Sequence, residues 1–573
     1  MVIQSPRNSE RVRHFVLTCA LLFAMSRVVF AQDPCADLVL LNGKVVTLDE
    51  RLPVCSAVAV QGDRITVVGS DQQIKQHIGE STKVIRLDGR LAIPGFIESH
   101  GHFVGLGQSK MWLDLSKAES WDEVVDNVAQ AAANKRAGEW IVGRGWHQSK
   151  WSRPPEPSVD GYPTHEKLSE VTPHNPVLLI HASGHMSFAN AKAMRLAGID
   201  GSTSNPRGGE ILKDENKNLT GAFRETAQSL IRRVQLDAAM SNAEISHVIE
   251  LATRECLSKG ITSFQDAGSS FSTIDIFRKL AKAGTLKVRL WIMVRDENAR
   301  MRSLLSKYRM VGVADNHLTV RAIKRSIDGA LGSHGAWLLA PYDDMPTSTG
   351  LNTSSLNSIR DTATLAIKHE YQLCVHAIGD RANRETLNIF ENMFRENPTS
   401  ESRRWRIEHA QHLHPDDIPR FSKLGVIASM QGIHCTSDAV FVIKRLGQRR
   451  AGEGAYVWKS LIESGAIVTN GTDAPVEDVD PIACFHASVT RQLASGVKFF
   501  PKQAMTREQA LRSYTIDAAY AAFEEKIKGS LSAGKLADIV ILSHDILTCA
   551  EDKIADAKVV QTIVGGEVRF NRD

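Results

Sequence analysis

The chain has 573 residues, of which 43% are hydrophobic and 23% charged, and its formal net charge is +4. This composition is typical of a globular protein and excludes a largely disordered chain. A nucleic-acid-binding surface needs clustered Lys and Arg, so the balanced charge gives no support for a nucleic-acid partner.

The N-terminus has the pattern of a secretory signal peptide over residues 1–31. Arg11 and Arg13 precede an apolar run at residues 15–25, and small residues near Ala31 offer a cleavage point. The run is too short to cross ~30 Å of hydrocarbon. We therefore expect an exported protein, periplasmic or secreted, with no membrane contact after signal removal. Arg27, between the run and the cleavage point, keeps an uncleaved membrane anchor open as the alternative.

Short β-branched stretches occur at both ends of the chain. Residues 36–48 and 56–69 alternate apolar and polar side chains and contain Asn-Gly and Gly-Asp turns, and the alternation returns at 537–542 and 559–570. Such a pattern predicts short antiparallel strands. Residues 32–90 and 521–573 are therefore expected to form one small β-sandwich domain built from both chain ends.

Between these ends, apolar stretches typical of strands alternate with stretches typical of helices. The predicted strands are residues 93–102, 260–266, 288–294, 318–324, 372–376, 405–409, 425–431 and 466–473. Eight β/α units predict an α/β fold, a closed TIM-like (β/α)8 barrel over residues 91–520, with its chemistry at the C-terminal strand ends. Residues 104–245 are too long for a loop and are predicted to be an insertion after the first strand.

Metal-ligating side chains stand at or near the predicted strand ends. His100 and His102 are two apart, so on a strand they share one face. The other strand ends bring a lysine, two histidines and an aspartate: Lys324, His376, His409 and Asp473. In a barrel these ends form one ring, and imidazole and carboxylate ligands suit two divalent cations, with zinc as the default.

The order His-x-His, Lys, His, His, Asp resembles that of the amidohydrolase superfamily. Further motifs resemble its amidohydrolase-3, or YtcJ-like, branch: residues 143–151, 183–190, 328–333, 514–519 and 529–538. The resemblance runs from about Asp37 to the C-terminus. It departs from the family pattern at His334, where Arg is more usual, and at Gly432, where Gln-Pro is expected. Both positions are expected to border the substrate, so the resemblance does not identify the substrate.

The resemblance implies a role for each ligand. His100, His102 and Asp473 would hold one ion, and His376 and His409 the other. Lys324 would be carboxylated and would bridge the two ions; the alternative is a structural lysine paired with Asp328 or Glu408. Asp473 would act as general acid and base in the hydrolysis of an amide-type, non-peptide C–N bond of a small molecule.

Five further residues are candidates for substrate binding: His185, His434, His334, Trp146 and Arg491. For Trp146 the alternative is packing, and for Arg491 it is a salt bridge on a helix surface. Two other functions stay open for the whole chain. A deaminase on the same barrel would use one metal ion and no bridging lysine, and a non-catalytic binding or regulatory protein would keep the fold alone. A homo-oligomer is possible, and the sequence does not decide this.

Overall fold

The computed structural model describes residues 35–236 and 241–572. The signal peptide predicted for residues 1–31 lies outside this range, so export stays a prediction. Within the range, no helix has both the length and the apolar composition that crossing a membrane requires.

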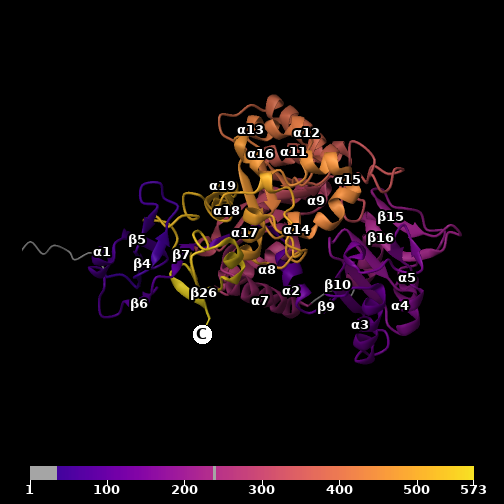
Figure 1. The fold of residues 1–573 in the computed structure, drawn as a ribbon, viewed down its shortest axis with the longest axis horizontal. Coiled ribbons are helices and arrows are strands. Elements are labelled where there is room, and N and C mark those ends of the chain that lie inside the picture. Colours follow the sequence, from indigo (N-terminus) through magenta and orange to yellow (C-terminus); the bar gives the residue numbers. More distant parts are fainter. Residues whose placement is uncertain (1–34, 237–240, 573) are drawn as a thin grey trace, which may run out of the picture.

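A nearly closed barrel of parallel strands occupies the centre of the molecule, which confirms the predicted fold (Figure 1). In sheet order the strands are β8 (Phe96–Gly101), β17 (Ile261–Ser269), β18 (Arg289–Val294), β20 (Leu318–Ser326), β21 (Gln372–Ala377), β22 (Arg406–His409), β23 (Ile427–Gln431) and β24 (Val468–Gly471). Nearly all their residues are buried, as expected for parallel strands that are covered on both faces.

The first and last strands meet at the mouth of the barrel. The backbone N–H of Asp473 donates to the carbonyl of His100 at 2.8 Å, and that of His102 donates to Ala474 at 2.7 Å. These bonds bring residues from opposite ends of the barrel sequence to one place.

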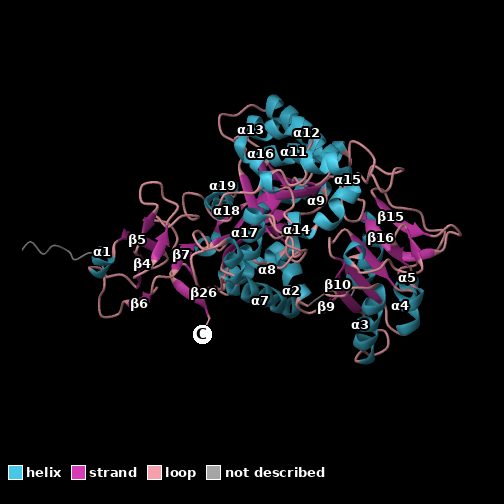
Figure 2. Ribbon diagram, viewed as in Figure 1, coloured by secondary structure: helices cyan, strands magenta, loops and turns pink. Residues whose placement is uncertain are grey.

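Helices surround the strands (Figure 2). They include α7 (Asn242–Ser258), α8 (Phe271–Lys282), α9 (Asn298–Tyr308), α11 (Leu356–Lys368), α12 (Asp380–Glu396), α13 (Ile418–Leu424), α16 (Trp458–Glu463) and α17 (Pro481–Thr490). Helix α8 shows why such segments form. The Ser270 side chain caps it by accepting a hydrogen bond from the N–H of Thr273, and Phe271, Ile274 and Phe277 form a buried stripe at helical spacing.

Two sheets lie beside the barrel, and together they use both chain ends, as predicted. One consists of N-terminal strands alone, and in the other, strands from the two ends lie side by side, indigo and yellow in Figure 1. One sheet has the order β5 (Arg64–Gly69), β4 (Ala57–Gln61), β1 (Leu38–Leu41) and β6 (Lys83–Arg86). The other has the order β27 (Glu567–Asn571), β26 (Val559–Val564), β25 (Ile539–Leu542), β7 (Leu91–Pro94), β2 (Lys44–Val46) and β3 (Val54–Cys55). Leu40, Val58 and Ile541 belong to the core that the two sheets share.

The predicted insertion contains a mixed sheet with helices. The sheet runs β15 (Gly209–Lys213), β16 (Leu219–Glu225), β14 (Met186–Ala189), β13 (Val177–His181), β10 (Ile141–Trp146) and β9 (Leu113–Asp114). Helices α3 (Trp121–Ala133), α4 (Glu166–Val171) and α5 (Ala191–Leu196) accompany it. The insertion reaches the barrel mouth, where Arg144 Nε donates to the carbonyl of Pro475 at 3.0 Å.

Candidate metal centre

Two histidines of the first barrel strand converge on one carboxylate from the last. His100, at the end of β8, is fully buried, and its Nε2 lies 3.5 Å from Asp473 Oδ1. His102 lies just beyond the strand, with its Nε2 at 3.3 Å from the same oxygen. The predicted pair therefore lies beside Asp473 at the mouth of the barrel, where the first and last strands meet.

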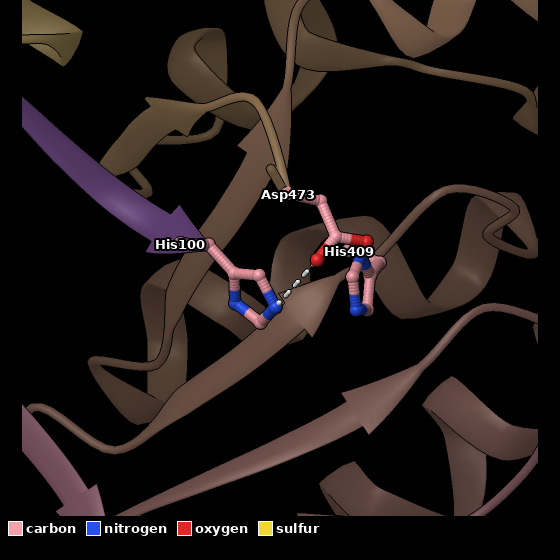
Figure 3. A group of neighbouring side chains, drawn as sticks. All are labelled: His100, His409 and Asp473. Carbon is pink, nitrogen blue, oxygen red and sulfur yellow. Dashed lines mark ion pairs between the residues drawn. The ribbon is translucent and has the colours of Figure 1, made fainter. Parts of the chain in front are cut away.

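A third strand end completes a compact group. The ligand atoms of His100, His409 and Asp473 all lie within 4.8 Å of one another, and all three residues are buried (Figure 3). A hydrogen bond at Nδ1 fixes the orientation of each imidazole. His100 Nδ1 bonds Glu408 Oε2, and His409 Nδ1 bonds Gln431 Oε1 at 2.8 Å. This leaves the Nε2 atom of each ring as the one available to a cation.

Two members of the group have unusual backbone conformations. Asp473 has a φ of 56° and His409 a φ of 74°, in the left-handed region that non-glycine residues rarely adopt. Such residues cost about 1–3 kcal/mol each and cluster at functional sites. At His409 the turn also breaks the strand alternation, so that Glu408 and His409 both contact His100.

Lys324 lies within this group. Its Nζ is 3.3 Å from His100 Nε2, and the side chain is buried in β20. Burial lowers the pKa of Lys324 to about 8, against the opposing charge of Glu408. Neither Asp328 nor Glu408 forms a salt bridge with Lys324 in the described part of the chain. The Asp328 carboxylate accepts three backbone N–H groups instead, and Glu408 pairs with His100 and Arg406.

His376 extends the group along the barrel mouth. Its ring lies 4.5 Å from that of His409, centroid to centroid, and burial holds its pKa well below the ordinary value. Its Nε2, 3.4 Å from Asp328 Oδ1, has no hydrogen-bond partner among the described residues, and neither does Asp473 Oδ1. Neutral imidazole nitrogens and a carboxylate oxygen without partners are the ligands that a divalent cation takes. The residues at these strand ends therefore fit a divalent metal.

Asp473 is held in its charged form. Burial raises the pKa of this carboxyl group, but contact with His102 and the nearby imidazoles of His409 and His100 outweigh it. The pKa lies well below its ordinary value, so the group is a carboxylate at neutral pH.

Two of the predicted substrate residues lie beside the cluster. The half-buried His185, in the insertion, has its ring 4.9 Å from that of His376, and its Nδ1 bonds Glu225 Oε2 at 2.7 Å. His434 begins the short helix α14 (His434–Ser437). Its Nδ1 accepts from Gln411 Nε2 at 2.8 Å, and its buried Nε2 has no partner among the described residues.

His334 lies apart from the metal-ligating residues. Its Nε2 is 3.3 Å from Asp344 Oδ1, its Nδ1 is 3.5 Å from the Tyr162 hydroxyl, and its ring packs against Tyr342. A Cβ at Gly432 would lie 2.3 Å from Ser488 Oγ, so glycine is required there by close packing against α17.

Trp146 and Arg491 are both buried and have partners within the protein. Trp146 is fully buried in the insertion core, where its Nε1 donates to the carbonyl of Leu179 at 3.3 Å. Arg491 is also fully buried. It donates to the carbonyls of Phe499 at 2.6 Å and Tyr456 at 3.0 Å, and its guanidinium stacks over Trp458. Trp146 thus has the packing role that was the alternative, and Arg491 is not in a surface salt bridge.

Sequence reasoning missed the residues that hold the ligands in place. Glu408 was considered only as a partner for Lys324, whereas it bonds His100. Gln431 and Glu225 were not considered at all. Gln431 ends strand β23 at the mouth, so its position at a strand end was a usable signal. Glu225 pairs with a histidine 40 residues away, and no local pattern indicates that.

Comparison with known sequences gives a match over most of the chain. The sequence profile described as "Amidohydrolase family" matches residues 83–570. Protein LONG AFTER FAR-RED 3 of Arabidopsis thaliana is 32% identical over 93% of this chain and 91% of its own length. The putative amidohydrolase YtcJ of Bacillus subtilis is 28% identical, over 93% and 99%. N-substituted formamide deformylase of Arthrobacter pascens is 27% identical, over 94% and 98%.

Comparison with solved structures also gives matches over most of the chain. An uncharacterised metal-dependent hydrolase from Pyrococcus horikoshii superimposes with a TM-score of 0.72 at 26% identity, over 90% of this chain and 99% of the other. Atrazine chlorohydrolase TrzN from Arthrobacter aurescens, solved in complex with zinc, has a TM-score of 0.52 at 14% identity, over 93% and 95%. At that identity, the second match shows a shared fold alone.

Proposed function

The chain belongs to the amidohydrolase family, and on this premise we propose that it hydrolyses an amide-type, non-peptide C–N bond of a small molecule. The family and its hydrolase relatives support a hydrolytic enzyme. The bond type is proposed from the relative named N-substituted formamide deformylase, which is similar over 94% of this chain.

One observation carries the proposal: His100, His409 and Asp473 bring their ligand atoms within 4.8 Å of one another in a buried site. Three residues from the first, sixth and eighth strands, more than 60 positions apart, meet at the end of the barrel where enzymes of this architecture place their chemistry. Buried charged and polar groups of this kind destabilise the folded state unless a ligand or an opposite charge compensates them.

We assign His100, His102 and Asp473 to one divalent ion, and His376 and His409 to a second. Lys324, with its Nζ 3.3 Å from His100 Nε2, would add carbon dioxide at its neutral amine and lose a proton, and the resulting carbamate would supply oxygen ligands to the metal. When bound, such ions polarise a carbonyl group and lower the pKa of a water molecule. Zinc is the proposed metal, because the ligands are nitrogen and oxygen donors.

Asp473 moves the proton in this proposal. As a carboxylate at the barrel mouth, it takes a proton from the attacking water and later gives it to the nitrogen of the leaving amine. Hydrogen bonds from the chain keep the neighbouring rings in place during these steps: Glu408 fixes His100 and Gln431 fixes His409. His185, held by Glu225, faces the same space from the insertion.

The direct test is an assay of zinc-loaded protein on a panel of N-formyl and N-acyl amines, with release of free amine as the readout. We expect hydrolysis of at least one class, and loss of that activity after chelation. A metal-loaded, folded protein that releases no amine from any member of the panel would reject the proposal.

A deaminase with one metal ion is the second candidate. It is favoured by the observation that three residues alone, His100, His409 and Asp473, form the tight group among the described residues. Release of ammonia from amino-substituted heterocycles, together with about one ion per chain, would support this candidate over the amide hydrolase.

A further inference from the structure

An unpaired arginine stands at the mouth of the barrel. Arg295 directly follows β18, and its backbone N–H donates to the carbonyl of Ser269 at 2.9 Å. The residue is exposed, yet burial by the surrounding protein lowers its pKa. In the described residues, its guanidinium has no hydrogen bond and no salt bridge.

Within the described residues, neither acidic group whose charge acts on Arg295 forms a salt bridge with it. The charges of Asp473 and Asp266 act on Arg295. Asp266 uses one carboxylate oxygen to accept the N–H of Phe103 at 2.9 Å and the other to accept the Ser269 hydroxyl at 2.7 Å. Asp473 faces His100 and His102. Arg295 directly follows the C-terminal end of β18, at the end of the barrel where the proposed reaction site lies, and its charge acts on Lys324.

Two more arginine side chains add to the positive charge around Arg295. Arg232 lies in α6 (Ser229–Leu236); its Nη2 donates to Gln228 Oε1 at 3.1 Å, and its Nε has no partner among the described residues. Arg144 donates from Nη2 to the carbonyl of Ala182 at 3.0 Å and from Nε to Pro475. Burial and the charge of Arg232 lower the pKa of Arg144 to about 10, and burial and Arg295 do the same to Arg232. Within the described chain none of the three forms a salt bridge with a carboxylate.

We propose that the substrate is an anion, an amide that carries a carboxylate group, and that Arg295 binds this carboxylate. The planar guanidinium presents paired N–H donors that match a carboxylate, and such charged hydrogen bonds are among the strong ones. Arg144 and Arg232 attract the anion through their charge, since clefts lined by one sign of charge concentrate ligands of the other. This inference rests on the proposed amide hydrolysis and names the substrate class for it.

Two matched substrate pairs test the inference on zinc-loaded protein. N-formylphenylalanine, in both enantiomers, and N-formyl-2-phenylethylamine differ by a carboxylate on the amine side. N-benzylsuccinamate and N-benzylbutanamide differ by a carboxylate on the acyl side. We expect kcat/KM to favour the charged member of at least one pair by about 10-fold or more.

Arg295→Gln is the diagnostic variant, and Arg302→Gln is its control, because Arg302 is an exposed arginine in the following helix. We expect Arg295→Gln to reduce kcat/KM for the charged member at least ~10-fold more than for the neutral one, mainly through KM. Arg302→Gln should keep the wild-type ratio. A wild-type preference for the neutral members, or an unchanged ratio in Arg295→Gln, would overturn the inference.

A binding measurement separates this inference from the proposed function. If neither pair is hydrolysed, amide hydrolysis itself is in question, and calorimetry with 3-phenylpropionate and 3-phenylpropanamide then decides the role of Arg295 without turnover. Weaker binding of the propionate to Arg295→Gln than to wild type, with the propanamide as reference, supports the carboxylate site. Equal propionate affinity in the two proteins contradicts it.

Discussion

Asp473 unites the features expected of a reactive carboxylate. It lies at the end of the last barrel strand in a left-handed backbone conformation, with φ at 56°. Its Oδ1 faces two histidines and has no hydrogen-bond partner among the described residues. A buried carboxylate that keeps its charge is costly for stability, and such groups cluster at functional sites, which supports the catalytic role proposed for Asp473.

We predict that Asp473→Asn leaves metal content near normal and lowers kcat at least ~10²-fold, because the amide can still ligate but cannot move a proton. The measurement is kcat beside metal analysis on the same preparation. Asp478→Asn, at an exposed position five residues on, should behave as wild type. Full activity in Asp473→Asn would remove the residue from the mechanism.

Gln431 is a positioning residue, because it touches His409 and not the reacting atoms. Replacing it by Met keeps the volume and removes the acceptor for the His409 ring. We predict a loss of metal affinity of about 10- to 100-fold, as is typical when the partner of a ligating histidine is removed. Competition with a zinc-binding dye measures this. Gln130→Met, at an exposed site in α3, is the control, and equal affinities in the two variants would show that Gln431 does not orient the ring.

At the scale of elements, a buried ion pair joins the barrel to the C-terminal strands. Arg289, which opens β18, donates from Nε to Asp538 Oδ2 at 2.8 Å and from Nη2 to Oδ1 at 3.0 Å. The side chains are 2% and 5% exposed, so removal of one partner leaves the other buried without compensation. We predict that Asp538→Asn destabilises the protein by about 3–5 kcal/mol, measured by denaturant unfolding. A change below ~1 kcal/mol would show that the pair is not a structural link.

The same pair predicts a pH dependence. Burial raises the pKa of Asp538, but the charge and hydrogen bonds of Arg289 outweigh it, so the folded-state pKa lies below the ordinary value. A carboxyl with a lowered pKa stabilises the fold above its unfolded pKa, about 3.9, and this contribution is lost as the pH falls through the folded value. The stability difference between wild type and Asp538→Asn should therefore be constant near neutral pH and shrink below about pH 4. A difference that grows on acidification would contradict the assignment.

The elements were largely predictable from the sequence, and the side-chain environments were not. All eight barrel strands appear where apolar stretches predicted them, because strands that are buried on both faces are largely apolar. The grouping of the candidate metal ligands was predictable from the topology, since a barrel brings its strand ends together. The burial of Trp146 and Arg491 was not predictable, because it depends on which elements pack against them. Arg295 was not singled out, because the sequence does not show whether an arginine side chain has a hydrogen-bond or salt-bridge partner.

At the scale of the whole molecule, metal binding and stability are coupled. Any ion that binds the folded barrel and not the unfolded chain stabilises it by about 2.7 kcal/mol at a free concentration 100 times its Kd. We predict that chelation lowers the Tm and that zinc restores it. His409→Ala should lose most of this response, whereas His247→Ala, at a position on α7 with a 57% exposed side chain, should keep it. An equal zinc response in both variants would place the binding elsewhere.

The central claim is that the strand ends of the barrel form a metal centre, and the metal content of the purified, zinc-equilibrated protein tests it most directly. We predict about two divalent ions per chain in the wild type, with a clear loss in His409→Ala. About one ion would favour the mononuclear deaminase. A folded wild-type chain that retains no divalent ion at micromolar zinc would contradict the claim.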